Sequence, residues 1–153
     1  MAIAPNVTFV SGAVLTAAQQ NAFGFGIVAL QTATTSDTTI TGTEEIQITV
    51  SFTAIANRYY KITYLEPNLN NNVDANVQLQ VRLTNVSGAI QGADYAFVRA
   101  GGFSATGILI AYSTFTAGAT TLVATLDSTV GTAAATRSAD FKAFLSVEDV
   151  GPA

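Results

Sequence analysis

The sequence predicts an all-β fold, a β-sandwich that is jelly-roll-like, with about eight strands and one short N-terminal helix. Its composition is the first indication, because 26 Ala, 22 Thr and 12 Gly, with few Lys, Glu and Leu, are typical of strands and turns. The second is a two-residue alternation of apolar and polar side chains, which half-buried antiparallel strands show. No helical pattern separates these stretches, which disfavours a parallel sheet with crossover helices.

Eight stretches of the chain are expected to form strands, with Gly, Asn, Asp and Ser between them. They cover residues 26–34, 45–52, 58–66, 76–84, 89–98, 107–115, 120–127 and 139–150. The Thr-rich residues 32–43 are expected to form an exposed loop. The strand order stays open, and an immunoglobulin-type sandwich is the near competitor of the jelly roll.

Alternation assigns one face of each strand to a common core. In the last strand, Phe141 and Ala143 are expected to share the face of the core residues that follow them. The side chains expected to be mostly buried are Ile46, Ile48, Val50, Phe52, Ile62, Tyr64, Val77, Leu79, Val81, Leu83, Ile108, Ile110, Leu122, Leu145 and Val147.

The N-terminal segment differs from the rest of the chain, and we divide the protein into an arm, residues 1–25, and a sandwich domain, residues 26–153. Residues 14–23 are expected to form a short helix, because Thr16 can cap it, Gln19 stands at the capping-box position and Gly24 follows its end. Two turns are too short to be stable alone. The helix therefore covers an open end of the domain or anchors the chain on a neighbouring subunit.

The arm has no charged side chain, yet it is rich in apolar ones. A solvated tail would not carry that much apolar surface without charge. We therefore expect its apolar residues to contact the sandwich, a sister chain or another protein. These candidate anchoring residues are Ile3, Val7, Phe9, Val10, Val14, Leu15, Phe23 and Phe25.

Composition excludes several classes of function. The chain has no Cys and no His, which removes thiol nucleophiles, disulfides, Cys/His zinc sites and histidine acid–base chemistry. A net charge of -4 argues against nucleic-acid binding, which needs clustered Lys and Arg. No apolar stretch near the start reaches the roughly 20 residues of a membrane span. We expect no catalytic residue, no cofactor and no membrane partner.

Carboxylates are the remaining acid–base candidates, in the adjacent pairs Glu44–Glu45 and Glu148–Asp149. Neighbours in a strand point to opposite faces, so neither pair converges on one bond by its spacing. The competing enzyme hypothesis is a glycosidase that uses Glu148 or Asp94. Solvated strand ends are the more common role of such residues.

Two further patterns have a functional and a plain structural interpretation. The Asn-rich residues 68–76 offer oxygen ligands for Ca²⁺, but Asp74 is their only carboxylate, and Asn is equally a turn residue. Tyr59, Tyr60, Tyr64 and Tyr95 could line a sugar platform. Alternation instead predicts that about half of these tyrosines are core.

Two end segments resemble small virion proteins of tailed bacteriophages. Residues 14–21, VLTAAQQN, resemble the "vLTAaqvN" stretch near the start of many of them, and residues 144–152, FLSVEDVGP, resemble the "LxVEDiGP" end of a set of them. The strand RYYKIT, residues 58–63, fits the same group. The resemblance implies a non-enzymatic virion protein, commonly a homotrimer, and it carries no catalytic residues.

The position on the particle follows from what the chain lacks. A fibre normally needs a shaft, and the sequence has no heptads, no Gly-X-Y pattern and no repeat. A capsid decoration protein, bound to the major capsid protein on the outside of the head, is therefore the preferred hypothesis. The alternative is a tail-fibre or minor tail component with a glycan-binding, adhesin-like sandwich.

Overall fold

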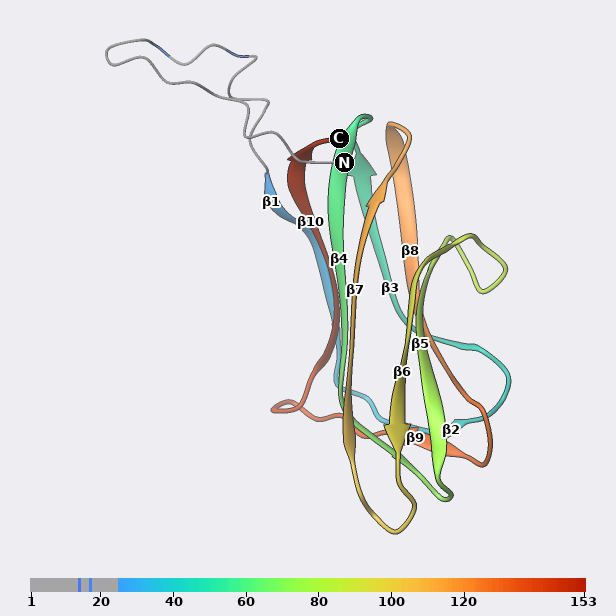
Figure 1. Cartoon of the computed structure of the whole chain (residues 1–153). Coiled ribbons are helices and arrows are strands. Elements are labelled where there is room, and N and C mark those ends of the chain that lie inside the picture. Colours follow the sequence, from blue (N-terminus) through green and yellow to red (C-terminus); the bar gives the residue numbers. More distant parts are fainter. Residues whose placement is uncertain (1–13, 15–16, 18–24) are drawn as a thin grey trace.

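The computed structural model describes residues 14, 17 and 25–153, and over them the chain forms two β-sheets packed face to face (Figure 1). This confirms the predicted β-sandwich. The strands are β1 (Gly26–Ala33), β2 (Asp37–Ile40), β3 (Glu45–Ala54), β4 (Arg58–Asn71), β5 (Ala75–Leu83), β6 (Ile90–Val98), β7 (Ala105–Thr114), β8 (Gly118–Ser128), β9 (Ala133–Ala135) and β10 (Ala143–Pro152).

The long strands are arranged as a jelly roll. Sheet A runs β1-β10-β4-β7, and the short β9 and β2 continue it beyond the end of β4. Sheet B runs β3-β8-β5-β6. Pairing is nested: β5 pairs with β6, β4 with β7, β3 with β8 and β1 with β10, all antiparallel. The chain thus behaves as one long hairpin wrapped into two layers, which is the jelly-roll topology.

The core lies between the two sheets, and alternation identified most of it. Twelve of the fifteen expected core residues are at least partly buried, and Leu83 alone among these is only partly so. Tyr60, Leu69, Leu109 and Leu126 are also among the largest buried side chains. Phe52, Tyr60 and Phe115 form an aromatic cluster at one end, with ring centroids 5.3–5.7 Å apart.

Three expected core residues are exposed, and the first is Ile46. A β-bulge lies between Ile46 and Ile48, so that Ile46 is opposite Thr125 while Ile48 is opposite the core residue Ala124. A bulge inserts one residue and reverses the alternation beyond it. Ile46 therefore points out of the sandwich, and Ile48 points in.

The phase of β7 is opposite to the prediction. Ile108 and Ile110 are exposed, and Leu109 is buried. This strand is apolar on both faces, so alternation in the sequence could not choose between them. Packing decides, because β7 approaches its neighbours closely: a Cβ atom at Gly107 would lie 2.7 Å from Leu79 Cδ2. The smaller set of side chains on β7 therefore faces the core.

Two other expectations are corrected. Residues 32–43 are not simply a loop, because they contain the end of β1 and all of β2, whose Ile40 is fully buried. Phe141 is exposed and precedes β10, which begins at Ala143. Irregular segments therefore lie between β1 and β2 and before β10, at positions that the sequence pattern does not mark.

The predicted helix at residues 14–23 lies outside the described residues, apart from Val14 and Ala17. Val14 is 89% exposed. Among the residues that the structure describes, no helix is long and apolar enough to cross a membrane.

Candidate functional site

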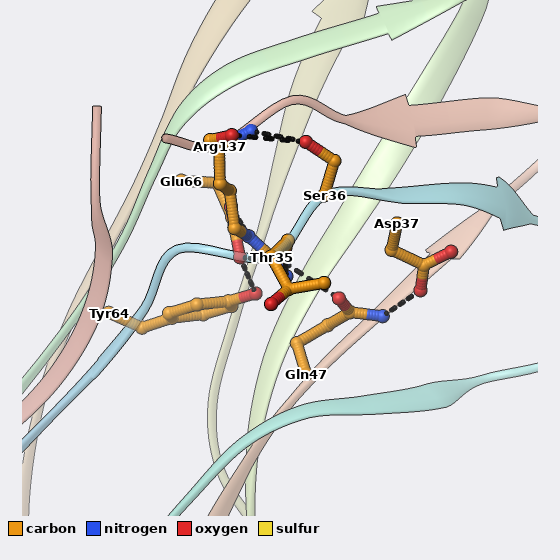
Figure 2. Close-up of polar contacts among 7 residues, drawn as sticks. All are labelled: Thr35, Ser36, Asp37, Gln47, Tyr64, Glu66 and Arg137. Carbon is orange, nitrogen blue, oxygen red and sulfur yellow. Dashed lines mark hydrogen bonds and ion pairs between the residues drawn. The ribbon is translucent and has the colours of Figure 1, made fainter. Parts of the chain in front are cut away.

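The first polar cluster is buried at the end of the sandwich where β2 and β9 lie. We call it the Arg137 network; Figure 2 shows its side chains, and its members are Asp37, Gln47, Tyr64, Glu66 and Arg137. Arg137 donates two hydrogen bonds to Glu66, from Nε to Oε2 at 3.0 Å and from Nη2 to Oε1 at 2.5 Å. The hydroxyl of Tyr64 donates to Glu66 Oε1 at 2.7 Å.

The network continues outward through Gln47. Arg137 Nη2 donates to Gln47 Oε1 at 2.7 Å, and Gln47 Nε2 donates to Asp37 Oδ2 at 2.8 Å. The Arg137 guanidinium also donates to the backbone oxygen of Thr35. The backbone nitrogen of Arg137 donates to Ser36 Oγ, and Ser36 Oγ donates to the backbone oxygen of Arg137. The network thus ties together β2, β3, β4 and the segments before β2 and after β9.

Electrostatics show that the groups of this network already have their partners. Burial raises the pKa of Tyr64 well above its ordinary value, and the neighbouring Glu66 charge adds to this. Burial opposes ionisation of Asp37, but hydrogen bonds from Gln47 and Thr39 and the Arg137 charge outweigh it, so the pKa of Asp37 is lowered. A saturated buried ion pair fixes one arrangement of the chain and leaves no group free for a ligand.

A groove of about 690 Å³ lies beside this network. It is lined by residues 32–39 together with Ile46, Gln47 and Arg137. The lining is rich in hydroxyl groups, and its charged side chains, Asp37 and Arg137, are held within the network. The groove therefore offers weak polar contacts and no free charge.

The second polar cluster lies on the outer surface of sheet B. We call this surface the sheet B face, and strand register assigns its side chains. Val77, Leu79 and Val81 point into the core, so the alternate residues of β5 point outward. Outward positions on β6, β5 and β8 form rows across the sheet: Tyr95, Gln78 and Asp127 in one, and Ala93, Gln80 and Thr125 in the next.

The cation on this face is neutralised within the face. Glu44 reaches over the sheet, and its Oε1 accepts from Arg82 Nε at 2.6 Å and from Thr125 Oγ1 at 2.5 Å. Arg82 Nη1 donates to the backbone oxygen of Gly88 at 3.1 Å. Arg82 therefore holds the Glu44 carboxylate in place, and its positive charge is paired with that carboxylate.

Two acceptor atoms beside this ion pair have no partner. Gln80 is only 5% exposed, and its Oε1 is buried without a hydrogen bond, as is Oδ1 of Asp127. Burial raises the pKa of Asp127, and the Glu44 charge adds to this against the opposing hydrogen bond from Gln80 and the Arg82 charge. Both oxygen atoms lie beneath the outer surface, and Asn68 Oδ1 is a third buried acceptor without a partner among the described residues.

Exposed aromatic rings stand next to these acceptors. Tyr95 and Phe97 are both outward residues of β6, in register with Gln78 and Asn76 of β5, and both are more than half exposed. Aromatic rings beside hydrogen-bond acceptors suit a ligand that has an apolar face and hydroxyl donors. The sheet B face is the candidate binding site.

The structure divides the predicted tyrosine platform. Tyr60 and Tyr64 are core residues, as alternation predicts for about half of the four, and Tyr60 Oη accepts from the backbone nitrogen of Ile55. Tyr59 lies on the outer surface of sheet A, and only Tyr95 lies on the sheet B face. Sequence reasoning missed Gln80 and Asp127 as a pair, because their register is decided by sheet topology.

The predicted carboxylate pairs do not converge. Asp149 is buried and paired with Arg58 at 2.5 Å, while Glu148 points outward and lies 3.7 Å from Lys61. Asp94 lies on β6, in the other sheet. Over the part of the chain that the structure describes, no three His, Cys, Asp or Glu side chains gather as a metal site.

The Asn-rich segment is a strand end and turn in which three side-chain oxygens accept from backbone nitrogens, while Asn68 Oδ1 is buried without a partner. Residues 68–71 belong to β4. Asp74 Oδ1 accepts from the nitrogen of Ala100, Asn71 Oδ1 from that of Val73, and Asn72 Oδ1 from that of Thr132. These bonds support the turn interpretation over the calcium interpretation.

Of the candidate anchoring residues, only Val14 and Phe25 are described. Both are exposed, and the guanidinium of Arg58 stacks over the Phe25 ring at 4.5 Å from its centroid. Ile3, Val7, Phe9, Val10, Leu15 and Phe23 lie outside the described residues.

No family model and no curated protein matches the chain. Among solved structures, the CBM22-1 xylan-binding domain of Xyn10C from Paenibacillus barcinonensis is similar over 86% of this chain and 98% of its own, with 12% identity and a TM-score of 0.38. CsCBM6-3 from Clostridium stercorarium, in complex with cellobiose, is similar over 80% and 94%, with 15% identity and a TM-score of 0.35.

A third similar structure is the enzymatically active domain of tailspike protein 4 from bacteriophage CBA120. It matches 79% of this chain and 19% of its own, with 11% identity and a TM-score of 0.30. Likenesses at these identities and TM-scores assign no function to this chain.

Proposed function

We propose that the protein is a non-enzymatic virion protein of a tailed bacteriophage whose sandwich binds neutral glycans through the sheet B face. One observation carries the binding proposal: the exposed rings of Tyr95 and Phe97 lie on the outer surface of sheet B, beside the polar row of Gln78 and Asp127. Exposed aromatic rings are a costly feature of a surface. A bound ligand that covers them relieves this cost.

The chemistry of this face selects the class of ligand. Sugar hydroxyls donate hydrogen bonds, and the apolar side of a sugar ring packs on an aromatic ring. The charges of Glu44 and Arg82 cancel, which leaves Asp127 as the net negative charge of this cluster. Acidic sugars would be repelled, so neutral glycans are the expected ligands.

The virion part of the proposal rests on the two end segments that resemble phage virion proteins. The apolar, uncharged arm supports attachment to another protein of the particle. A ligand-binding face favours a tail or adhesin role over the capsid-decoration role that the absence of a shaft indicated. The homotrimer that the resemblance implies stays a prediction.

The non-enzymatic part rests on the carboxylates. Glycosidases need two carboxyl groups facing each other across the scissile bond. Over the described residues, Asp149 is engaged with Arg58 and Glu66 with Arg137. Glu148 and Asp127 lie on the outer surfaces of opposite sheets. On the sheet B face, the Glu44 carboxylate is engaged with Arg82 and Thr125, so Asp127 faces no free carboxylate there among the described residues. We therefore expect this face to bind without turnover.

The test is calorimetry of the purified protein with a panel of soluble neutral and acidic oligosaccharides. Tyr95→Ala should weaken binding of a neutral ligand by about tenfold or more, from the loss of ring stacking. Tyr112→Ala is the matched control, because Tyr112 is 61% exposed and Tyr95 56%, on opposite sheets. Phe97→Ala should weaken binding comparably, because Phe97 is the second exposed ring of this face.

Three results would overturn parts of this proposal. No binding across the panel, or equal losses in the two tyrosine variants, would remove the glycan site. Release of reducing sugar that is lost in Glu148→Gln or Asp94→Asn would make the protein an enzyme. Electron microscopy of labelled protein on intact particles separates head from tail, and labelling of the head lattice would restore the decoration hypothesis.

A further inference from the structure

The outer surface of sheet A is a broad apolar face. We call it the sheet A face, and it consists of the outward side chains of β7, β4, β10 and β1. Strand register arranges them in three rows across the sheet. The rows are Ile108–Leu65–Phe144–Thr32, Ile110–Thr63–Ser146–Leu30 and Tyr112–Lys61–Glu148–Ile27.

This face is unusual for a surface exposed to water. Ile27, Leu30, Ile110 and Tyr112 are each more than half exposed. Four strands about 4.8 Å apart, each contributing five residues about 3.4 Å apart, give a projected area of roughly 300 Å². The largest exposed patch of a protein surface is commonly of about this size and is often functional.

The only charges in these three rows are Lys61 and Glu148, which are register partners on β4 and β10. Their charged atoms are 3.7 Å apart, and both side chains are about a third or more exposed. An exposed pair of this kind contributes little to stability on its own. The pair occupies the two middle strands of the third row, which is informative about what can cover this face.

We propose that the sheet A face pairs with the same face of a second copy of the chain. A two-fold axis parallel to the strands, midway between β4 and β10, brings β4 opposite the partner's β10 and β7 opposite the partner's β1. Each row then meets itself in reverse order. Lys61 lies opposite the partner's Glu148, and Ile110 lies opposite the partner's Leu30.

The remaining positions follow from the same operation. They pair Tyr112 with the partner's Ile27, Leu65 with the partner's Phe144, Thr63 with the partner's Ser146 and Ile108 with the partner's Thr32. Only the last of these pairs sets an apolar side chain against a polar one. Lys61 and Glu148 each face an opposite charge in the partner as well as in their own chain. Isologous contacts require this self-complementarity, and two sheets pack face to face about 10 Å apart with aligned strands. A different protein would have to supply the same charge pattern in reverse.

Sedimentation equilibrium of the full chain tests the proposal. The wild type should be a dimer and not the homotrimer that the resemblance to phage virion proteins implies. Lys61→Glu and Glu148→Lys should each weaken the dimer by about tenfold or more, because each homodimer then opposes like charges. An equimolar mixture of the two variants should regain the dimer. The introduced glutamate of one chain then faces the introduced lysine of the other, and the native Glu148 of the first chain faces the native Lys61 of the second.

Folding and alternative occupants are controlled separately. Circular dichroism shows whether each variant keeps its sheet structure, and Thr49→Glu, an exposed position on β3 of the other sheet, should leave the dimer intact. Ile110→Glu should give a folded monomer. A monomeric wild type, a dimer or trimer unmoved by Ile110→Glu, or a mixture that stays monomeric would overturn the proposal.

Discussion

The two polar clusters of this protein are built from similar side chains and differ in how completely they are satisfied. The Arg137 network contains a glutamine, carboxylates and an arginine, and its buried charges are held by short hydrogen bonds. The sheet B face also contains a glutamine, carboxylates and an arginine, yet Gln80 Oε1 and Asp127 Oδ1 have no partner. Complete hydrogen bonding fixes one arrangement of the Arg137 network, whereas each unpartnered buried acceptor beneath the sheet B face costs stability.

The largest expected effect is on the Arg137 network. Glu66→Ala leaves the Arg137 charge buried without its carboxylate, which should lower the free energy of unfolding by about 3–5 kcal/mol. Urea unfolding measures this. Asp140→Ala, at an exposed carboxylate, should change it by no more than about 0.5 kcal/mol. A loss below about 1 kcal/mol in Glu66→Ala would mean that the network does not fasten the sandwich.

The next effect compares a core side chain of sheet B with an exposed side chain of sheet A. Leu79 and Gln80 are neighbours on β5, and Leu79 points into the core while Gln80 points to the sheet B face. Leu79→Ala should cost about 2–5 kcal/mol, from lost burial and a cavity. Ile110→Ala, at an exposed position, should cost about 1 kcal/mol at most at dilute protein concentration. Equal costs would mean that the assignment of Leu79 to the core and Ile110 to the surface is wrong.

A matched pair of glutamines tests the comparison directly. Gln47→Met removes the bond from Arg137 and the bond to Asp37, and should cost about 1–3 kcal/mol. Gln80→Met removes one unpartnered acceptor and the hydrogen bond to Asp127, and should change stability by about 1 kcal/mol or less. Thermal and urea unfolding of both variants give the result. A larger cost at Gln80 than at Gln47 would reverse the assignment of the two clusters.

The smallest effects are in the pH dependence, where the two clusters should have opposite signs. The pKa of Asp37 is lowered on folding, so its contribution is present above the ordinary value of 3.8 and is lost as the pH falls through the folded-state pKa. The pKa of Asp127 is raised, so the folded chain binds this proton more tightly and loses stability as the pH rises above 3.8.

Unfolding free energies of Asp37→Asn and Asp127→Asn, measured against wild type from about pH 2.5 to 6, resolve these signs. The penalty of Asp37→Asn should grow as the pH rises. Asp127→Asn should instead become more favourable, relative to wild type, over the same rise. Parallel trends in the two variants would contradict the opposite environments of the two carboxyls.

Local pattern sufficed for much of the fold. Alternation in β3, β4 and β5 identified Val50, Ile62 and Leu79 as core, because burial of one face imposes a two-residue period on any such strand. The same pattern could not determine the phase of β7, where both faces are apolar. It also could not show the bulge before Ile48, because a bulge shifts the register without leaving a mark in composition.

The sequence by itself determined the class of fold, the absence of thiol and histidine chemistry, and most of the core. Only the tertiary structure decided which side chains meet on the two proposed binding surfaces. Gln80 and Asp127 are far apart in the chain, and so are Lys61 and Glu148; they meet because nested strand pairing sets β8 beside β5 and β10 beside β4. Side chains that converge across strands depend on strand order and register, which are global properties of the packed sheets.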